Sequence, residues 1–172
     1  MKMMLIISII ITAFSISVSA QTDEPVICDE DFRLVVHVMG ETCVPNHPQR
    51  IVPLDLTVFE LLLLAEMPPV AFSDVILHTY QKMHPDLEET FVQFRGQFID
   101  IGLPPNIEKI LNVEPDLIIG SHDMFTEALY PHLSQIAPTV LYEPLREDWQ
   151  TRFIIAGEAL GFNQLVQAQL ET

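Results

Sequence analysis

The stretch IGLPPNIEKILNVEPDLIIG, Ile101–Gly120, determines the fold because almost every position in it has a readable structural role. Pro104 and Pro105 end whatever element precedes them, because proline lacks a backbone N–H and restricts its neighbour. Asn106 can cap a helix by accepting a hydrogen bond from one of its first free amides, and Glu108 lies in the first turn, near the positive end of the helix dipole. The stretch therefore predicts a helix that begins directly after Asn106.

The second half of the same stretch predicts a buried strand. Ile107, Ile110 and Leu111 give the helix one apolar face at helical spacing, and Pro115 prevents the helix from continuing. The short apolar run at residues 117–119 follows at once. Such a run is typical of a strand that is covered on both faces inside a parallel sheet, so the stretch forms half of a βαβ unit.

The flanking sequence repeats this alternation of strand and helix. Further strands are expected at residues 51–54, 70–72, 98–101 and 139–142. Helices are expected at residues 57–66, where Thr57-x-x-Glu60 forms a capping box, at 124–130, and from Glu147 onward. Pro131 ends the second of these helices and can itself start another turn. Residues 73–96 show a blurred pattern with room for one short helix at 87–94, and residues 34–39 begin a hairpin that turns at Gly40.

These segments, in this order and at this spacing, resemble the N-terminal lobe of the substrate-binding proteins of ABC importers for iron-siderophores, haem and cobalamin. In that class one long helix joins two lobes. The resemblance rests on residues 101–120, on His47–Val52 with the helix that follows, and on residues 149–161; it extends from about Leu34 to the C-terminus. It implies an α/β, Rossmann-like three-layer lobe with a mostly parallel sheet, an N-terminal β-hairpin and the start of a long interlobe helix.

The first twenty residues have the pattern of a secretory signal peptide. Lys2 precedes the apolar residues 3–14, and a tail of small residues ends in Val18-x-Ala20 before Gln21. Cleavage after residue 20 would release an exported, periplasmic protein. An uncleaved N-terminal anchor is the alternative, because residues 3–20 are almost long enough to span a bilayer.

The remaining length matches one lobe of the resembled class. Residues 21–146 are expected to form the N-terminal ligand-binding lobe, and residues 147–172 the beginning of the interlobe helix, with the C-terminal lobe absent from this chain. A member of the class is about twice as long. We therefore expect a fragment or truncated gene product, with a half-length relative as the alternative.

The charge balance excludes one class of partner. The 172 residues include 24 Asp or Glu and 8 Lys or Arg, and the formal net charge is −16. Removal of the first twenty residues would remove one lysine and no acid, which makes the balance about −17. A chain this acidic is not expected to bind nucleic acid. Most of the acidity is interpreted as favouring solubility.

The two cysteines, Cys28 and Cys43, are expected to form a disulfide if the chain is exported, since an oxidising compartment makes the bond the default. In the chain-entropy model such a bond contributes on the order of 3 kcal/mol. A tight hairpin turning at Gly40 would place Cys43 opposite residue 37 or 38, so Cys28 must fold back to reach it. Two free thiols remain the alternative.

Candidate ligand-binding residues follow from the topology. Open α/β sheets bind ligands outside the carboxyl ends of their strands. The residues at or just after those ends that we assign to ligand binding are Asp55, Thr57, Ser73, Gly102, Ser121, His122 and Tyr142. Each has a structural alternative: Thr57 and Ser121 can cap the helices that follow them, and Tyr142 can line the core.

Arg95 is the candidate cation of the cleft, because a planar guanidinium suits the carboxylate and hydroxamate oxygens of an iron chelate. The resemblance places an Arg within or just before the segment at residues 102–105 in the hydroxamate-binding branch, and this segment has none. Arg95 lies seven residues before it. An ordinary surface charge is the alternative.

Glu108 is the candidate contact with the permease. The resemblance implies that a Glu at this position lies on the outer surface of the lobe and meets an Arg cluster on the ABC permease of the inner membrane, with a second Glu from the other lobe. A carboxylate at this position also stabilises the helix N-terminus, by about 0.3–1 kcal/mol. The two roles are compatible.

Catalytic and metal chemistry find little support. The six histidines include no pair at i, i+4 spacing, and no G-x-S-x-G elbow or glycine-rich phosphate loop occurs. We therefore expect no catalytic residue, no metal site and no cofactor. The expected function is the capture of a ferric siderophore outside the cytoplasmic membrane and its delivery to an ABC permease. The alternatives are a non-transporting half-length interaction protein and a protein that binds haem, cobalamin or a metal.

Overall fold

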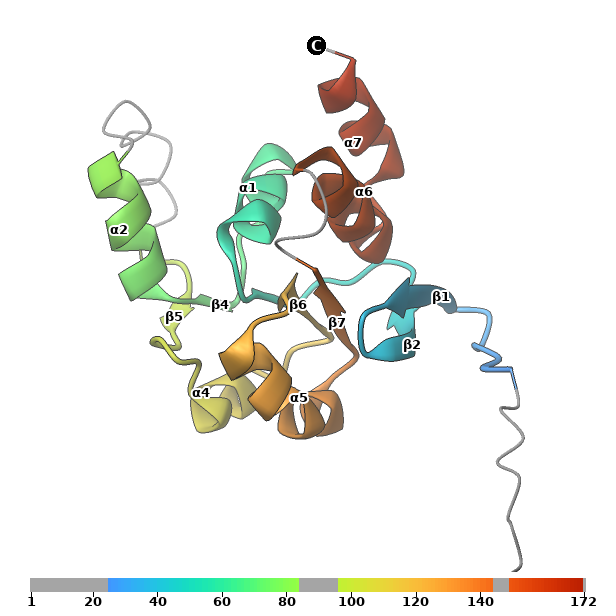
Figure 1. Cartoon of the computed structure of the whole chain (residues 1–172), viewed down its shortest axis with the longest axis horizontal. Helices are drawn as coiled ribbons and strands as arrows, with labels where there is room; N and C mark the ends of the chain where they lie inside the picture. The colour runs from blue at the N-terminus through green and yellow to red at the C-terminus, as the bar shows by residue number, and fades with distance from the viewer. Residues whose placement is uncertain (1–24, 84–95, 144–148, 172) are drawn as a thin grey trace, which may run out of the picture.

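The structure is a computed structural model, and it describes residues 25–83, 96–143 and 149–171. Its centre is a parallel sheet (Figure 1). β3 (Ile51–Pro53), β6 (Leu117–Ser121) and β7 (Thr139–Tyr142) pair side by side, and β4 (Ala71–Phe72) pairs with β5 (Ile99–Asp100). The Val70 amide donates to the carbonyl of Ile51 at 3.0 Å, which places β4 beside β3. The strands therefore lie in the order β5-β4-β3-β6-β7.

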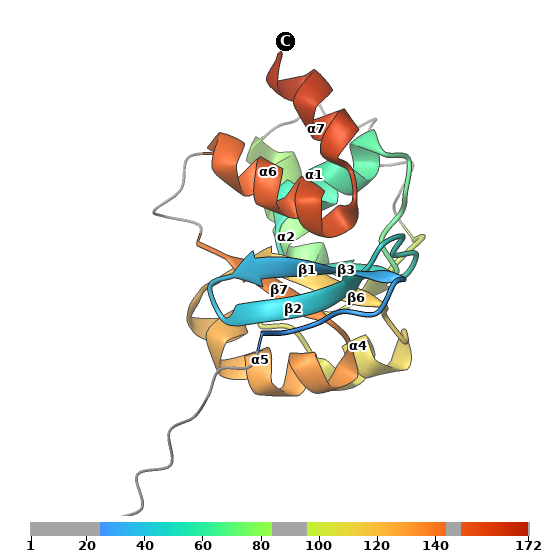
Figure 2. The ribbon, with the colours of Figure 1, turned by 90° about the vertical axis from the view of Figure 1, so that its right-hand side faces the viewer.

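Helices cover both faces of this sheet, which gives three layers (Figures 1 and 2). α1 (Leu56–Leu64) and α6 (Trp149–Leu160) lie on one face, and α4 (Ile107–Asn112) and α5 (Met124–Ile136) lie on the other. α2 (Asp74–Met83) lies beyond β4 and β5, and α7 (Asn163–Leu170) continues from α6. The predicted α/β fold class is confirmed.

The apolar run of β6 supplies both halves of the core. Leu117 and Ile119 are fully buried in the cluster that contains residues of α1 and α6, whereas Ile118 is fully buried in the cluster on the α4 and α5 side. Successive side chains of a strand point to opposite faces, so a sheet covered twice needs an uninterrupted apolar run. Each such buried side chain contributes about 1.5–3 kcal/mol.

The details predicted for residues 101–120 are confirmed. The Asn106 side chain accepts a hydrogen bond from the Lys109 amide at 3.0 Å and caps α4, which ends before Pro115. Gly120, within β6, is required by a close approach: a Cβ there would lie 2.7 Å from the Cβ of Leu54. The residue before β3 is bonded to the residue before β6, because the Asp116 carboxylate accepts from the backbone amide of Arg50 at 2.9 Å.

The N-terminal hairpin is present with a different register from the one expected. β1 (Phe32–His37) and β2 (Gly40–Pro45) are antiparallel, and Cys43 lies opposite Leu34 rather than residue 37 or 38. The turn is formed by residues 38 and 39, just before Gly40. Cys28 and Cys43 are bonded in the structure, with their Cα atoms 5.5 Å apart. The hairpin forms a two-stranded sheet of its own and lies against β7, where the Val38 amide donates to the carbonyl of Leu141.

Two helix boundaries differ from the prediction. α5 continues through Pro131 to Ile136, because Leu133 in its second half is fully buried in the core and this packing outweighs the lost hydrogen bond. α1 is capped by Asp55 and not by a Thr57-x-x-Glu60 capping box: the Asp55 side chain accepts from the Val58 amide at 3.1 Å. Glu60 instead accepts from the hydroxyl of Tyr80.

Two further helical regions were not predicted as they occur. α2 occupies part of the segment whose pattern was blurred, and the helix expected at residues 87–94 lies outside the described residues. The C-terminal region forms two helices rather than one, because the chain breaks at Gly161, which has φ +78°. Gly161 is favoured there since side chains resist positive φ. Within the described ranges no helix is both long and apolar enough to cross a membrane.

Candidate functional site

The candidate site lies at the point where the strand order of the sheet reverses. The chain runs outward from β3 to β4 and β5 on one side and from β6 to β7 on the other. The loops after β3 and β6 therefore separate, and the crevice between them is where open α/β sheets bind ligands. Asp55 follows β3, and Ser121 is the last residue of β6.

Asp55 joins three elements at this crevice. Its Oδ1 accepts from the Val58 amide, and its Oδ2 accepts from the hydroxyls of Ser121 and Tyr142, each at 2.5 Å. Burial, and next the charge of Asp55, raise the pKa of Tyr142 above its ordinary value. Tyr142 therefore remains a neutral hydroxyl donor. The carboxylate of Asp55 thus accepts its hydrogen bonds from groups of the protein itself.

An open pocket of about 410 Å³ lies over this cluster. Its volume falls in the usual range of small-molecule sites. The pocket has polar and apolar parts. The polar lining residues are Asp55, Thr57, Ser121, Asp123 and Arg152, and the apolar ones are Leu54, Leu56, Ile76, Leu103 and Phe125. Leu103 and Phe125 are 48% and 44% exposed, so they offer apolar surface to a ligand.

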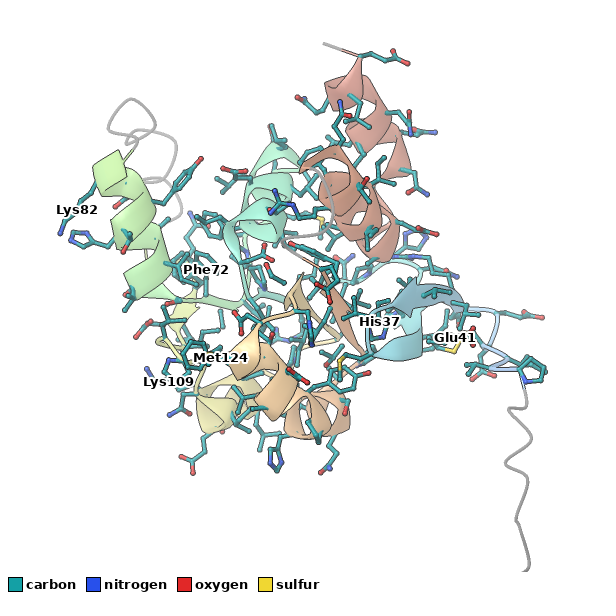
Figure 3. The ribbon with its side chains drawn as sticks, in the orientation of Figure 1. His37, Glu41, Phe72, Lys82, Lys109 and Met124 are labelled. Atoms are coloured by element: carbon teal, nitrogen blue, oxygen red, sulfur yellow. A yellow bond between two sulfur atoms is a disulfide. The ribbon has the colours of Figure 1, made fainter. Side chains whose placement is uncertain are left out.

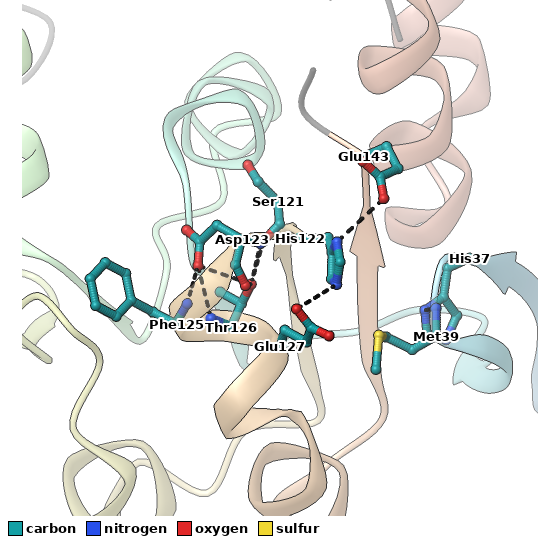
Figure 4. Close-up of polar contacts among 9 residues, drawn as sticks. All are labelled: His37, Met39, Ser121, His122, Asp123, Phe125, Thr126, Glu127 and Glu143. Atoms are coloured by element: carbon teal, nitrogen blue, oxygen red, sulfur yellow. Dashed lines mark hydrogen bonds and ion pairs between the residues drawn. The ribbon is translucent and has the colours of Figure 1, made fainter. Parts of the chain in front are cut away.

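Asp123, the second carboxylate of the pocket, also accepts hydrogen bonds from the protein. Its Oδ1 accepts from the amides of Phe125 at 2.7 Å and Thr126 at 2.9 Å, and the Thr126 hydroxyl accepts in turn from the Asp123 amide (Figure 4). This capping box begins α5. Both acids of the pocket thus lie at helix N-termini, where backbone amides stabilise their charge.

The structure brings some of the predicted site residues together and separates others. Asp55, Thr57 and Ser121 line the pocket. Tyr142 is not a lining residue, but its hydroxyl donates a hydrogen bond to the lining residue Asp55. Gly102 lies beside the lining residue Leu103, and its amide donates to Asp100 at 2.9 Å. Ligand binding by these residues stays a prediction.

His122 and Ser73 have other contacts. His122 points away from Ser121, as expected for successive residues of an extended chain, and its ring lies 3.3 Å from Glu143 and 3.7 Å from Glu127 (Figure 4). Ser73 is buried, and its hydroxyl accepts from the Ile76 amide at 3.4 Å in the first turn of α2. Arg95 lies outside the described residues.

Arg152 is a pocket residue that was not identified from the sequence. The signal that could have revealed it is a cation on the apolar face of a helix. Ala156 and Leu160, which follow Arg152 at intervals of four, are both buried against the sheet, so Arg152 shares their face of α6. A charged side chain on this otherwise apolar face is costly to bury, so it is expected near a polar site or a crevice.

Two further expectations concern metal ligands and the permease contact. In the described ranges, no group of three or more His, Cys, Asp or Glu side chains could hold a metal ion. Glu108 is exposed in the first turn of α4, next to Lys109, whose ammonium group bonds the Asp100 carbonyl at 2.6 Å. The contact of Glu108 with a permease stays a prediction.

Comparison with known proteins identifies the class. Residues 78–171, more than half of the chain, match the family model of the periplasmic binding proteins, and the chain therefore belongs to this family. The family and its solved structures are binding proteins.

Several relatives bind ferric chelates by name. The chain is 30% identical over 136 residues to the Fe(3+) dicitrate-binding periplasmic protein FecB of Escherichia coli, which covers 77% of this chain and 43% of FecB. It is 29% identical over 113 residues to the ferric-anguibactin-binding protein FatB of Vibrio anguillarum, which covers 64% of this chain and 32% of FatB.

A solved structure, that of Staphylococcus aureus SirA complexed with staphyloferrin B, matches with a TM-score of 0.63 and 27% identity over 81% of this chain and 46% of SirA. The likeness supports the three-layer α/β fold. This chain spans 32%, 43% and 46% of the lengths of FatB, FecB and SirA, respectively.

Proposed function

We propose that this chain is the N-terminal ligand-binding lobe of a substrate-binding protein that captures a ferric siderophore for an ABC importer. The observation that carries the proposal is the pocket at the strand-order reversal, built on Asp55, Ser121 and Tyr142, in a member of the periplasmic binding protein family. Relatives named for ferric dicitrate, ferric anguibactin and staphyloferrin B support a ferric chelate as the ligand.

The chemistry of the pocket is compatible with this ligand class. A ferric chelate presents oxygen atoms around the metal and an organic backbone outside them, so it needs polar groups at the floor and apolar contact at the rim. Thr57 and Ser121 provide hydroxyls, and Leu103 and Phe125 provide exposed apolar surface. No bond is made or broken in this role, and the iron is cargo rather than a cofactor.

The first experiment measures which ligand binds. Isothermal titration of the chain with ferric dicitrate, a ferric catecholate, a ferric trihydroxamate, haem and cobalamin should give saturable binding for at least one ferric chelate. Ser121→Ala, which removes a hydroxyl at the pocket and adds no bulk, should weaken that binding. Binding of haem or cobalamin alone would replace the proposed ligand class, and binding of none would refute the proposal.

Export and docking complete the proposal. Residues 1–20 would direct the chain out of the cytoplasm as a signal peptide, and Glu108 would contact the permease. Glu108→Arg should then reduce chelate uptake in cells at least tenfold while leaving chelate affinity unchanged. Glu41→Arg is the matched control, since Glu41 is also exposed but lies on the hairpin at the other side of the molecule from Lys109 and α4 (Figure 3). Equal uptake by the two variants would remove the docking role.

A further inference from the structure

The hydroxyl protons of Ser121 and Tyr142 are both directed at Asp55. The two hydroxyl oxygens lie 2.5 Å from Asp55 Oδ2, which accepts a hydrogen bond from each of them. A carboxylate offers only lone pairs, so both hydroxyls must be the donors, and a hydroxyl has a single proton to donate. Ser121 and Tyr142 therefore have no proton left for a ligand, although each oxygen can still accept a hydrogen bond.

At this point the pocket consequently offers acceptors to a ligand. Ser121 lines the pocket, whereas Tyr142 is only 1% exposed and lies out of reach of a ligand. Asp55 Oδ1 accepts from the Val58 amide, and a carboxylate oxygen has about two acceptor sites, so one site remains. The Thr57 hydroxyl can rotate to donate or to accept, so it suits either kind of ligand group.

Asp123 adds acceptor capacity to the same pocket. Its Oδ1 accepts from the amides of Phe125 and Thr126, while its Oδ2 accepts no hydrogen bond from the part of the chain that the structure describes. The Asp123 side chain is exposed and lines the pocket. Asp55, Ser121 and Asp123 are called the acceptor cluster below. A ligand group that meets this cluster needs protons to donate.

The charges of the pocket favour a cationic group. Two carboxylates, of Asp55 and Asp123, and one guanidinium, of Arg152, are the charged groups among the described lining residues. Within the described ranges neither carboxylate forms an ion pair. The whole chain has a formal net charge of −16. A concave site with an excess of negative charge raises the local concentration of cations and lowers that of anions.

We propose that the acceptor cluster binds a protonated amine of the siderophore, so that the chain selects ferric chelates that carry such a group over otherwise equal chelates without it. This inference rests on the proposed function. An ammonium group has three donors and no acceptor, which complements a surface that presents lone pairs. Its hydrogen bonds to carboxylates are charge-assisted and therefore strong. An anionic oxygen at the same place would meet acceptors and negative charge.

The test compares two probes that differ in one charge. The first is a linear ferric trihydroxamate that ends in a primary amine, and the second is its N-acetyl derivative, which keeps the iron centre and one N–H but loses the charge. At pH 7 the amine is protonated, as a lysine side chain is. Isothermal titration of the whole chain with each probe, at one ionic strength because charged ligands respond to salt, gives the ratio of the two affinities.

Asp55→Asn is the decisive variant. An asparagine caps a helix as well as an aspartate, so its carbonyl oxygen can keep the bond from the Val58 amide while its NH2 group faces the two hydroxyls. The hydroxyls must then accept, and the proton of Ser121 becomes available to the pocket. Asp123→Asn removes the other charge without reversing a hydroxyl. Glu41→Gln is the control of equal charge change, since Glu41 is exposed on the hairpin and does not line the pocket (Figure 3).

We expect wild type to bind the amine probe about tenfold to a hundredfold more tightly than its acetyl derivative, the range of a charge-assisted hydrogen bond. The ratio should fall below about threefold in Asp55→Asn, be intermediate in Asp123→Asn, and remain within about twofold of wild type in Glu41→Gln, because distant exposed charges are screened. A ratio of affinities does not depend on the folded fraction of a variant.

The results that would overturn the inference differ in what they leave standing. If wild type binds both probes equally, or prefers the acetyl derivative, or if Asp55→Asn keeps the wild-type ratio, the acceptor cluster does not select an amine. The same holds if wild type binds neither probe but binds another ferric chelate; in each of these cases the proposed capture of a ferric chelate stands. If wild type binds no ferric chelate, both proposals fail together.

Discussion

His37 shows how a single side chain can make stability depend on pH. Its Nδ1 faces the backbone amides of Met39 at 3.4 Å and Leu141 at 3.3 Å, and its Nε2 lies 2.9 Å from the hydroxyl of Thr42. Two N–H groups directed at Nδ1 require a lone pair there, so the neutral ring fits and the charged ring does not. Burial lowers the pKa of His37 below its ordinary value of 6.5.

The sign of the pH effect follows from linkage. Between the lowered pKa of the folded state and 6.5, the unfolded chain binds a proton at His37 and the folded chain does not. The stabilising contribution is fully present above pH 6.5 and is lost as the pH falls through the folded-state pKa. Urea unfolding at pH 7.5 and 5.5 should therefore show the free-energy advantage of wild type over His37→Gln shrinking at pH 5.5. A pH-independent advantage would contradict this assignment.

Residue types and topology together predicted the hydrogen-bonded cluster of Asp55, Ser121 and Tyr142 at the pocket, but not all of the residues that line the pocket. Asp55, Ser121 and Tyr142 could be placed because each follows or ends a strand, and parallel strands end at one edge of a sheet. Arg152 could not, because its position depends on how α6 packs across that edge, which helical periodicity alone does not specify. The contacts of the His122 ring with Glu127 and Glu143 were not predicted, and ligand binding by His122 stays a prediction.

Among the elements, the N-terminal hairpin is attached to the end of α6 through Arg33. Three groups of its guanidinium donate to the carbonyls of Pro45, Glu158 and Ala159, the last two of which end α6. Helix C-termini leave carbonyls unsatisfied, and an arginine beside them both bonds them and complements the dipole. Burial lowers the pKa of Arg33, and the nearby charge of Glu158 opposes that shift.

Replacing Arg33 should release the hairpin from α6. Arg33→Gln loses the charge and at least two of the three hydrogen bonds, and we expect the free energy of unfolding to fall by about 2–4 kcal/mol. Thermal and urea unfolding measure the loss, with Lys82→Gln as a control of equal charge change. A loss below about 0.5 kcal/mol would mean that the hairpin and α6 hold together without this contact.

The Cys28–Cys43 bond fastens the start of the described chain to the same hairpin. Its residues are 15 apart in sequence, and a loop of this length corresponds to about 3 kcal/mol in the chain-entropy model. Reduction, or replacement of both cysteines by serine, should lower the free energy of unfolding by about that amount and leave chelate affinity unchanged, because the bond lies away from the pocket. A change in affinity would show that the hairpin communicates with the site.

Caps, prolines and apolar runs predicted correctly those helices and strands in which tertiary packing favours the same structure. The helix after Asn106 and the strand at residues 117–121 have a cap, a terminating proline and an apolar run that all indicate the same structure. The end of α5 was misplaced because Pro131 opposes a helix locally, while burial of Leu133 favours one. The helix at residues 74–83 was not predicted, because its consecutive apolar residues 75–77 do not by themselves distinguish a helix from a strand.

The whole molecule is a three-layer α/β lobe whose pocket lies where the strand order reverses. The fold class and the family are established. We propose that the ligand binds at the loops after β3 and β6 and at the start of α5, and not on the opposite face of the molecule or on the hairpin.

Paramagnetic high-spin Fe(III) offers the most direct test of that location. In amide NMR spectra, a bound ferric chelate broadens resonances close to the iron, and the diamagnetic Ga(III) chelate provides the reference. We predict strong broadening at Thr57, Ser121 and Phe125 and little at Glu41 in the hairpin or Leu170 in α7. Broadening centred on the hairpin or on α2, with the pocket amides unaffected, would contradict the account.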